Sequence, residues 1–179
     1  IPVNVTLIFS VERYREVMNA YLTGLEERLS QGKPVSPVAS VASFFVSRLD
    51  TALDPMLIKK NSPLAGEIAI ANSKAAYLEF EKIFSSERFA KLKGRGAQVQ
   101  RPLWASTGTK NPSYSDVLYV ERLMGPQTVN TAPPATLDAF RDHGVPGARL
   151  RDDIQNAPFV IARLQELGIN LNEVTRQLE

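Results

Sequence analysis

The chain has 179 residues, of which 44% are hydrophobic and 22% charged, a composition typical of a globular protein with one substantial core. Its 21 basic and 19 acidic residues leave a net charge of +2, which is too balanced to indicate a nucleic-acid or membrane partner. It has no cysteine and one histidine, which excludes disulfide frameworks, thiol nucleophiles and Cys/His zinc sites.

Two further patterns concern partners and location. No stretch of about 18 apolar residues is present, and the first ten residues lack the basic segment and cleavage site of a signal peptide. We therefore expect a cytoplasmic protein with no membrane partner. The basic run KLKGRGAQVQR, residues 91–101, has no interleaved aromatic residue. It predicts a solvated helix end and loop, and we expect no nucleic-acid partner.

The first predicted elements are a strand and a helix. The opening run IPVNVTLIFS, residues 1–10, is apolar except for Asn4, Thr6 and its last residue, and predicts a buried strand. Ser10 is placed to cap a helix, because the apolar residues behind it recur at spacings of three and four. This helix is expected to end near Gly32.

The rest of the chain continues the alternation of strands and helices. VASVASFFVS, residues 38–47, lacks polar alternation and predicts a strand buried on both faces. A helix with a loosely apolar face follows at about 64–84, and QVQRPLWAST, residues 98–107, predicts the third strand. The remaining expected elements are a helix at 115–124, a short strand at 128–131, and helices at 133–140, 151–167 and 170–179.

Four strands that alternate with helices predict an α/β fold with right-handed βαβ units and a parallel sheet. Two architectures are open, a doubly wound sheet and part of a (β/α)8 barrel. A nucleotide-binding doubly wound sheet usually has a glycine-rich turn after its first strand, and FSVERYR has none. Polar residues follow each strand here, as at the site-bearing end of a barrel. A whole barrel needs about 250 residues, so we expect about half of one, with two open sheet edges.

Several polar and aromatic residues allow a structural and a functional interpretation. Asn4 and Thr6 are either satisfied core side chains that bond neighbouring strands or members of a site. Arg48 either pairs with Asp50 at the surface or binds an anion. We expect His143 to cap the carbonyls of the preceding helix and to have no catalytic role. Packing is the expected role of Trp104, Tyr114 and Tyr119.

Four motifs in order, VNVTLIFSVERY, SVASFFVSRLD, RPLWASTGTKNPSYSDVLYV and TVNTAPPATLDAF, resemble the second half of transaldolase. Transaldolase is a class I aldolase on a (β/α)8 barrel, and the similar subgroup is the bacterial one that also occurs fused to glucose-6-phosphate isomerase. The resemblance extends from residue 1 to the final RQLE. It implies that residues 1–179 form a single domain that covers about strands 5 to 8 of the barrel with their helices.

The resemblance implies the transfer of a dihydroxyacetone unit from sedoheptulose 7-phosphate to glyceraldehyde 3-phosphate in the pentose phosphate pathway. The reaction runs through a lysine Schiff base without a metal or organic cofactor. In the family this lysine lies on the fourth strand, with acidic helpers on the first and third. We therefore expect these residues upstream of Ile1 and expect the isolated chain to be inactive.

The resemblance also implies which residues line the catalytic centre. It assigns Asn4 to a substrate contact and Thr6 to holding the catalytic water. Ser43 and Phe45 are expected along the substrate channel.

A second group is implied at the sugar phosphate. Arg48 is expected to contact the phosphate, and Ser106 and Lys110 are expected beside it. Lys110 stands where the best-known subgroup has an arginine, so it supplies charge without the planar double contact of a guanidinium. An ordinary loop lysine is the alternative.

Two other functions are open. In the first, the chain is an inactive phosphosugar-binding fragment. In the second, it belongs to an enzyme similar to fructose-6-phosphate aldolase. The expected partners are sugar phosphates and either the missing barrel half or a second copy of the chain, because half a barrel leaves its sheet edges open.

Overall fold

The computed structural model describes residues 2–178 and contains one parallel sheet with the strand order β1-β2-β3-β4. The strands are β1 (Val3–Ile8), β2 (Ser40–Phe45), β3 (Gln100–Ala105) and β4 (Val129–Asn130). Strands that are consecutive in sequence are neighbours in the sheet, as in successive units of a (β/α)8 barrel. The predicted α/β fold, with parallel strands alternating with helices, is therefore confirmed and is consistent with part of such a barrel.

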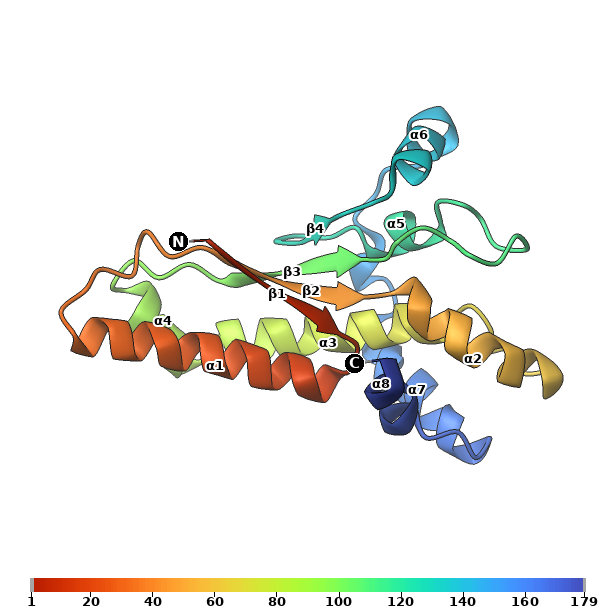
Figure 1. Ribbon diagram of the computed structural model, residues 1–179, viewed down its shortest axis with the longest axis horizontal. Helices are drawn as coiled ribbons and strands as arrows, with labels where there is room; N and C mark the ends of the chain where they lie inside the picture. The colour runs from red at the N-terminus through yellow and green to blue at the C-terminus, as the bar shows by residue number, and fades with distance from the viewer. Residues whose placement is uncertain (1, 179) are drawn as a thin grey trace.

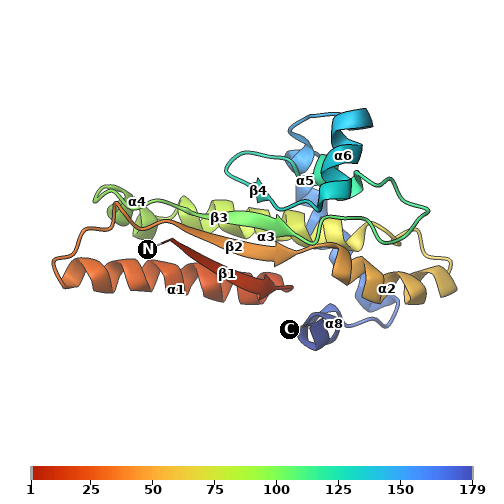
Figure 2. The same ribbon diagram turned by 45° about the horizontal axis from the view of Figure 1, so that its top comes forward.

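The long helices cover one face of the sheet. Figure 1 shows α1, α3 and α4 along this face, with β4 and α6 beyond β3, and Figure 2 shows the same arrangement after rotation. α5 packs against α3, on the helix-covered side. Within residues 2–178, no helix is both long enough and apolar enough to cross a bilayer. The helices are α1 (Val11–Ser30), α2 (Ser47–Lys59), α3 (Ile68–Phe84), α4 (Glu87–Lys93), α5 (Leu118–Leu123), α6 (Pro134–His143), α7 (Ala157–Glu166) and α8 (Leu171–Leu178), with short 3-10 turns at Arg149–Arg151 and Ile154–Asn156.

The first helix forms as the sequence predicts. The Ser10 hydroxyl accepts a hydrogen bond from the Arg13 amide at 3.1 Å, which satisfies one of the free N–H groups of the first turn. The helix ends before Gly32, whose φ of 70° lies in the left-handed region that glycine adopts without strain.

Two helices, α2 and α4, were not predicted from the sequence. α2 begins directly after β2, without a side-chain cap, and it contains Pro55, so it lacks the usual start signal and carries a helix breaker. α4 is a short helix within a charged stretch, and Ser86 caps it through the Phe89 amide. Its last turn contains Lys91 and Lys93, which confirms the expected solvated basic helix end.

The main core lies between the sheet and the helices that cover it. The Tyr14 ring of α1 packs edge-on against Phe44 of β2 at 5.7 Å, and Phe44 packs against Trp104 of β3 at 6.1 Å. The Trp104 indole nitrogen donates to the Leu123 carbonyl at 2.9 Å, so its predicted packing role is confirmed. Because side chains alternate along a strand, residues next to Phe44 and Trp104 face the other side of the sheet.

The first strand is less buried than the sequence suggests. β1 is an edge strand, and within the described chain it pairs only with β2. Val3 is 50% exposed and Leu7 46% exposed, so the prediction of a buried strand at residues 1–10 is wrong for most of β1. Asn4 and Thr6 are also exposed, which contradicts their interpretation as satisfied core residues. An apolar run therefore indicates a strand here without indicating what covers it.

A β-bulge interrupts β1 close to these polar residues. Val5 pairs with Ala42, and the next pair in the register is Ile8 with Phe44. Between these two pairs β1 therefore contains one more residue than β2, which defines the bulge. Leu7 has a φ of 60° within this bulge, a backbone conformation that costs free energy in a leucine. The extra residue returns the buried Ile8 to the helix-covered core.

Candidate functional site

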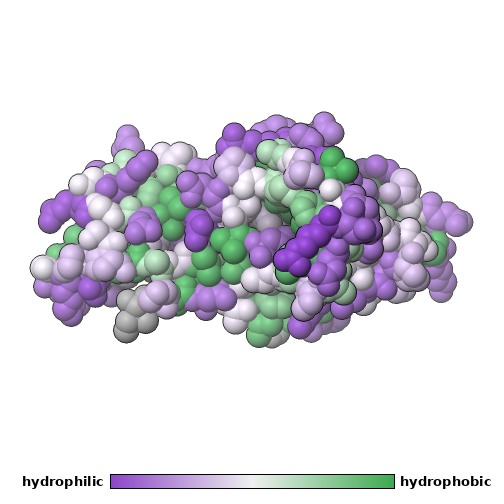
Figure 3. All heavy atoms as spheres, turned by 90° about the horizontal axis from the view of Figure 1, so that it is seen from above, coloured by the Kyte–Doolittle hydropathy of each residue, from purple (hydrophilic) through white to green (hydrophobic). Residues whose placement is uncertain are grey.

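The predicted site residues of the first two strands meet on the face of the sheet opposite α1. Val3 and Val5 line an apolar groove of about 300 Å³ with residues of α1, so Asn4, between them, faces the other way. The Ser43 hydroxyl donates to Asn4 Oδ1 at 2.8 Å. Figure 3 views the molecule from above, where apolar patches alternate with polar ones over this uncovered side.

The Asn4 and Ser43 pair leaves hydrogen-bonding groups available for a ligand. Because Asn4 Oδ1 accepts from Ser43, the amide NH2 of this exposed side chain remains free to donate. Among residues 2–178 the Thr6 hydroxyl has no hydrogen-bond partner, and it is exposed. Ser43 itself is buried, with 3% exposure, and its hydrogen bond fixes the orientation of the Asn4 side chain.

Arg48 lies beside Phe45 at the end of β2. Its guanidinium carbon is 5.0 Å from the centre of the Phe45 ring, a cation–π contact that orients an exposed positive charge. The alternative in which Arg48 pairs with Asp50 is contradicted, because the Asp50 carboxyl accepts from the Ala69 amide and the Tyr119 hydroxyl, each at 2.8 Å. Arg48 is thus exposed and held on the Phe45 ring, and Asp50 has other hydrogen-bond partners.

Ser106 forms a pair with a residue that the sequence analysis left out of the site. The Ser47 and Ser106 hydroxyl oxygens are 2.8 Å apart, and the Ser47 amide donates to the Ser106 carbonyl at 2.9 Å. Ser106 has a φ of 56°, a strained backbone of the kind often found at functional sites. The strand register could have indicated this pair, because Phe45 is registered with Ala105 and each serine follows shortly after.

Two further residues join the strand ends. The Thr107 hydroxyl donates to Asn130 Oδ1 at 2.8 Å, which links the segment after β3 to β4. Gly108 packs closely on the start of α6, since a side-chain carbon there would lie 3.1 Å from Pro133 Cγ and 3.3 Å from the Thr136 hydroxyl. The start of α6 therefore lies against the segment that carries Ser106.

Lys110 lines a cavity that the other predicted site residues do not line. It lines a cavity of about 220 Å³ together with residues of α2, Asn111 and two tyrosines. Asn4, Ser43, Phe45, Arg48 and Ser106 do not line this cavity. The structure thus groups Asn4 with Ser43 and Ser106 with Ser47, and places Lys110 over α2.

Two buried acids, Asp50 and Asp54, line the cavity that contains Lys110. Burial raises the pKa of Asp50 to about 7, and the opposing hydrogen bonds from Tyr119 and Ala69 only moderate this effect. Burial, with a hydrogen bond to Asp54, raises the pKa of Tyr114 to about 12. Tyr114 and Tyr119 both donate to carboxylates, so their predicted packing roles are confirmed and extended.

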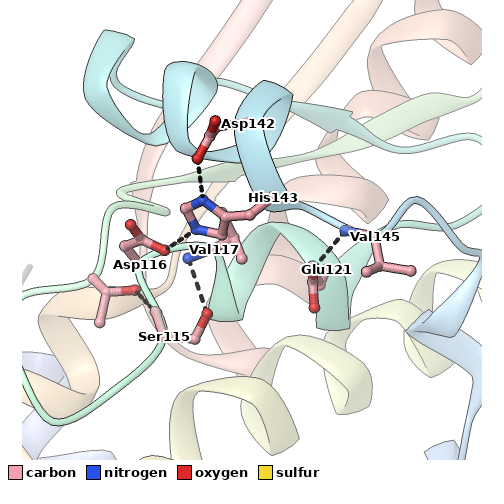
Figure 4. Close-up of polar contacts among 8 residues, drawn as sticks. Ser115, Asp116, Val117, Glu121, Asp142, His143 and Val145 are labelled. Atoms are coloured by element: carbon pink, nitrogen blue, oxygen red, sulfur yellow. Dashed lines mark hydrogen bonds and ion pairs between the residues drawn. The ribbon is translucent and has the colours of Figure 1, made fainter.

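The single histidine makes surface contacts, shown in Figure 4. His143 Nε2 lies 2.8 Å from Asp116 Oδ1, and Nδ1 lies 3.1 Å from Asp142 Oδ2. These carboxylates raise the pKa of His143. The ring nitrogens thus meet side chains, and the expected capping of helix carbonyls is wrong.

Lys74 is a buried lysine that the sequence analysis did not single out. It is 5% exposed, burial lowers its pKa, and its amine donates to the Asp152 carbonyl at 2.5 Å. It belongs to α3, in the layer of helices that covers the sheet (Figure 1). Its contact joins α3 to the turn before α7, away from the uncovered face.

Comparison with known proteins gives one family. Residues 1–179 match the family model described as Transaldolase/Fructose-6-phosphate aldolase. The chain is 52% identical over 184 residues to the transaldolase of Parafrankia sp. (strain EAN1pec), and 52% identical over 184 residues to that of Mycolicibacterium smegmatis. It is 51% identical over 185 residues to the transaldolase of Mycobacterium tuberculosis H37Rv. Each alignment covers 100% of this chain and 50% of the relative, so the chain spans about half the length of the curated relatives it matches.

Proposed function

The chain belongs to the transaldolase/fructose-6-phosphate aldolase family, and from this premise we propose that it is the carboxyl-terminal half of a transaldolase. In this proposal residues 1–179 are one domain that supplies about strands 5 to 8 of the barrel. The whole protein transfers a dihydroxyacetone unit from sedoheptulose 7-phosphate to glyceraldehyde 3-phosphate. The Schiff-base lysine and its acidic helpers are contributed by the half that is absent from this sequence.

The observation that carries this proposal is the Asn4 and Ser43 pair on the uncovered face of the sheet. An enzyme that positions a polyol needs donors and acceptors at fixed places, and the free amide of Asn4 offers such a donor. The exposed Thr6 hydroxyl, two residues further along the strand, suits the holding of a water for proton transfer. Ser43 fixes Asn4 and adds to the substrate wall with Phe45.

Arg48 is the proposed phosphate ligand, with Ser106 as its neutral partner. Arg48 is exposed and stacked on Phe45, which presents its remaining donors to an anion. Ser106 is held at its hydroxyl by Ser47, on the helix whose second residue is Arg48. Lys110 adds a second positive charge from its position over α2. The missing barrel half, or a second copy of the chain, is the proposed partner along β1.

Borohydride trapping with fructose 6-phosphate tests the assignment of the half. Because the Schiff-base lysine lies in the other half, we expect no covalent adduct on this polypeptide by intact mass. Lys74 has the lowered pKa that an imine-forming amine needs, so a Lys74→Met variant serves as the control for stray labelling. An adduct on any lysine of this chain that the wild type forms reproducibly contradicts the proposed register.

Calorimetric titration with fructose 6-phosphate tests the phosphate site directly. We expect Arg48→Ala to weaken binding about tenfold or more, because it removes a charge-assisted contact. Arg95→Ala is the matched control, since Arg95 is also exposed and precedes β3, at the opposite end of the strands. Equal affinities of the two variants would contradict the role of Arg48.

The family description includes fructose-6-phosphate aldolase, which keeps an aldolase function as the second candidate. Both activities use a sugar phosphate and a lysine imine, so binding alone does not separate them. The complete protein separates them by its acceptor. Release of free dihydroxyacetone supports the aldolase, and a strict requirement for an aldose phosphate acceptor supports the transaldolase.

A further inference from the structure

Two buried carboxylates one helical turn apart on α2 connect three parts of the chain. Asp50 is 1% exposed and Asp54 is 5% exposed. Asp54 accepts a hydrogen bond from the Gly66 amide at 3.0 Å and one from the Tyr114 hydroxyl at 2.8 Å. Asp50 makes the equivalent pair of contacts one turn earlier, to an amide at the start of α3 and to the Tyr119 hydroxyl of α5. Each carboxylate thus joins α2 both to the entrance of α3 and to the chain after β3.

The two tyrosines differ in what they anchor. Tyr114 belongs to residues 106–117, which connect β3 to α5 and carry Ser106 and Lys110. We call these residues the β3–α5 segment. At its start the segment is joined to α2 by the Ser47 and Ser106 contacts, and near its end by the Asp54 and Tyr114 bond. Tyr119 lies beyond the segment, within α5.

The position of Tyr114 depends on a glycine opposite its ring. A side-chain carbon on Gly66 would lie 2.9 Å from Tyr114 Cζ and 3.1 Å from its hydroxyl oxygen, which is closer than such contacts occur. Gly66 also has a φ of 77°, a conformation that favours glycine. Asp54 therefore provides the hydrogen-bond acceptor for the Tyr114 hydroxyl, and Gly66 leaves the space that the Tyr114 ring occupies.

We propose that Asp54 and Tyr114 are positioning residues for the phosphate site, because their bond holds the β3–α5 segment on α2 and so fixes Ser106 and Lys110 relative to Arg48. The inference rests on the proposed function, since it assumes that Arg48 and Ser106 receive the sugar phosphate. In this role Asp54 and Tyr114 act through the β3–α5 segment and need no contact with the phosphate. Their effect is to reduce the number of positions that the segment adopts before the ligand arrives.

The test compares two tyrosine variants of the complete 179-residue chain. Tyr114→Phe and Tyr119→Phe each remove one hydroxyl that donates to a buried carboxylate of α2. A purely structural role predicts similar consequences for both variants. We expect Tyr114→Phe alone to weaken the binding of fructose 6-phosphate, by about five- to tenfold in calorimetric titration. Tyr119→Phe is expected to lower the unfolding midpoint and to keep the wild-type dissociation constant.

A second measurement follows the segment without any ligand. Trypsin cleaves after Lys110, which is exposed, at a rate that depends on how often the segment leaves its place. We expect Tyr114→Phe to raise this cleavage rate about fivefold or more and Tyr119→Phe to leave it within twofold of the wild type. Asp54→Asn is the second variant for the same measurements, because it keeps an acceptor for the Gly66 amide, and it is expected to change both in the direction of Tyr114→Phe.

The outcomes separate this inference from the proposed function. A wild-type chain that binds no fructose 6-phosphate contradicts the phosphate site, and the positioning role is overturned with it. Tight binding by the wild type with unchanged binding by Tyr114→Phe overturns the positioning role alone. Equal loss of affinity in the two tyrosine variants also overturns it, because the hydroxyl then acts only through overall stability.

Discussion

The exposed polar pair on β1 and the buried acidic pair on α2 use similar side chains in opposite ways. Asn4 and Thr6 face the uncovered side of the sheet, and only Asn4 Oδ1 is engaged, by Ser43. Asp50 and Asp54 are buried, and each accepts two hydrogen bonds from the chain itself. Polar groups that the fold satisfies hold the fold together, whereas those that it leaves unsatisfied are available to a ligand.

Removing one of the buried carboxyls is expected to have the strongest effect on stability. Asp50→Ala leaves the Ala69 amide and the Tyr119 hydroxyl without their acceptor in the core, so we expect a loss of about 2–6 kcal/mol in the free energy of unfolding. Asn4→Ala, at an exposed position, is expected to cost under about 1 kcal/mol. Urea denaturation of both variants measures the difference. Comparable losses in the free energy of unfolding would contradict the different roles of the buried and the exposed pair.

The same carboxyl predicts how stability depends on pH. Burial raises the pKa of Asp50 to about 7, from about 3.9 in an unfolded chain. The folded chain keeps this proton between those values while the unfolded chain loses it. The contribution of Asp50 is therefore fully present below about pH 4 and is lost as the pH rises to about 7.

Unfolding free energies measured at several pH values check this expectation. Relative to Asp50→Asn, we expect the wild type to lose up to about 1.4 kcal/mol per pH unit within the window. Parallel curves for the two proteins would show that Asp50 does not titrate there. Asn4→Ala is the control from the exposed pair and is expected to keep the wild-type slope.

The open edge beside Asn4 predicts association of the isolated chain. Val3 is 50% exposed on an edge strand, so we expect copies to associate through β1 and Val3→Lys to weaken this about tenfold. Val145→Lys is the matched control, since Val145 is 53% exposed just after α6. Sedimentation equilibrium distinguishes them. A wild-type chain that stays monomeric at all concentrations would contradict the open-edge interpretation.

The smallest expected effect concerns the surface contact between α6 and Asp116. Because Asp116 and Asp142 raise the pKa of His143, its imidazole resonance should titrate above pH 6.5. In Asp116→Asn the midpoint should fall toward the ordinary value, since the larger contribution is removed. The chain has one histidine, so the resonance needs no assignment by comparison. An unchanged midpoint would show that the contact at 2.8 Å does not persist in solution.

The sequence predicted the elements that carry strong local patterns. The helix capped by Ser10 and the strands at β2 and β3 formed close to their expected limits, because periodicity and capping are local properties. α2 was missed, since it starts without a cap and contains Pro55. The burial of β1 was overestimated, because an apolar run does not tell whether the rest of the chain covers it.

The site was predictable in its strand-end residues and not in their pairings. Asn4, Ser43 and Ser106 were named from motifs, but the Ser47 partner of Ser106 follows from the strand register. The sequence suggested only a surface pairing of Asp50 with Arg48. The burial of Asp50 results from the packing of α2 against α3 and α5. Contacts between residues far apart in sequence depend on packing, which no short window of sequence contains.

The bulge at Leu7 has a consequence for any chimera in which another segment is joined to β1. On one side of the bulge the odd-numbered Val3 and Val5 face the helices, and on the other side the even-numbered Ile8 does. A splice placed before Val3 preserves this change of parity, whereas a splice after Leu7 with a regular strand in front of it turns Asn4 and Thr6 equivalents toward the wrong layer. A one-residue deletion at Leu7 is a different case, because it removes the extra residue of the bulge and leaves Val3, Val5 and Ile8 facing the same layer.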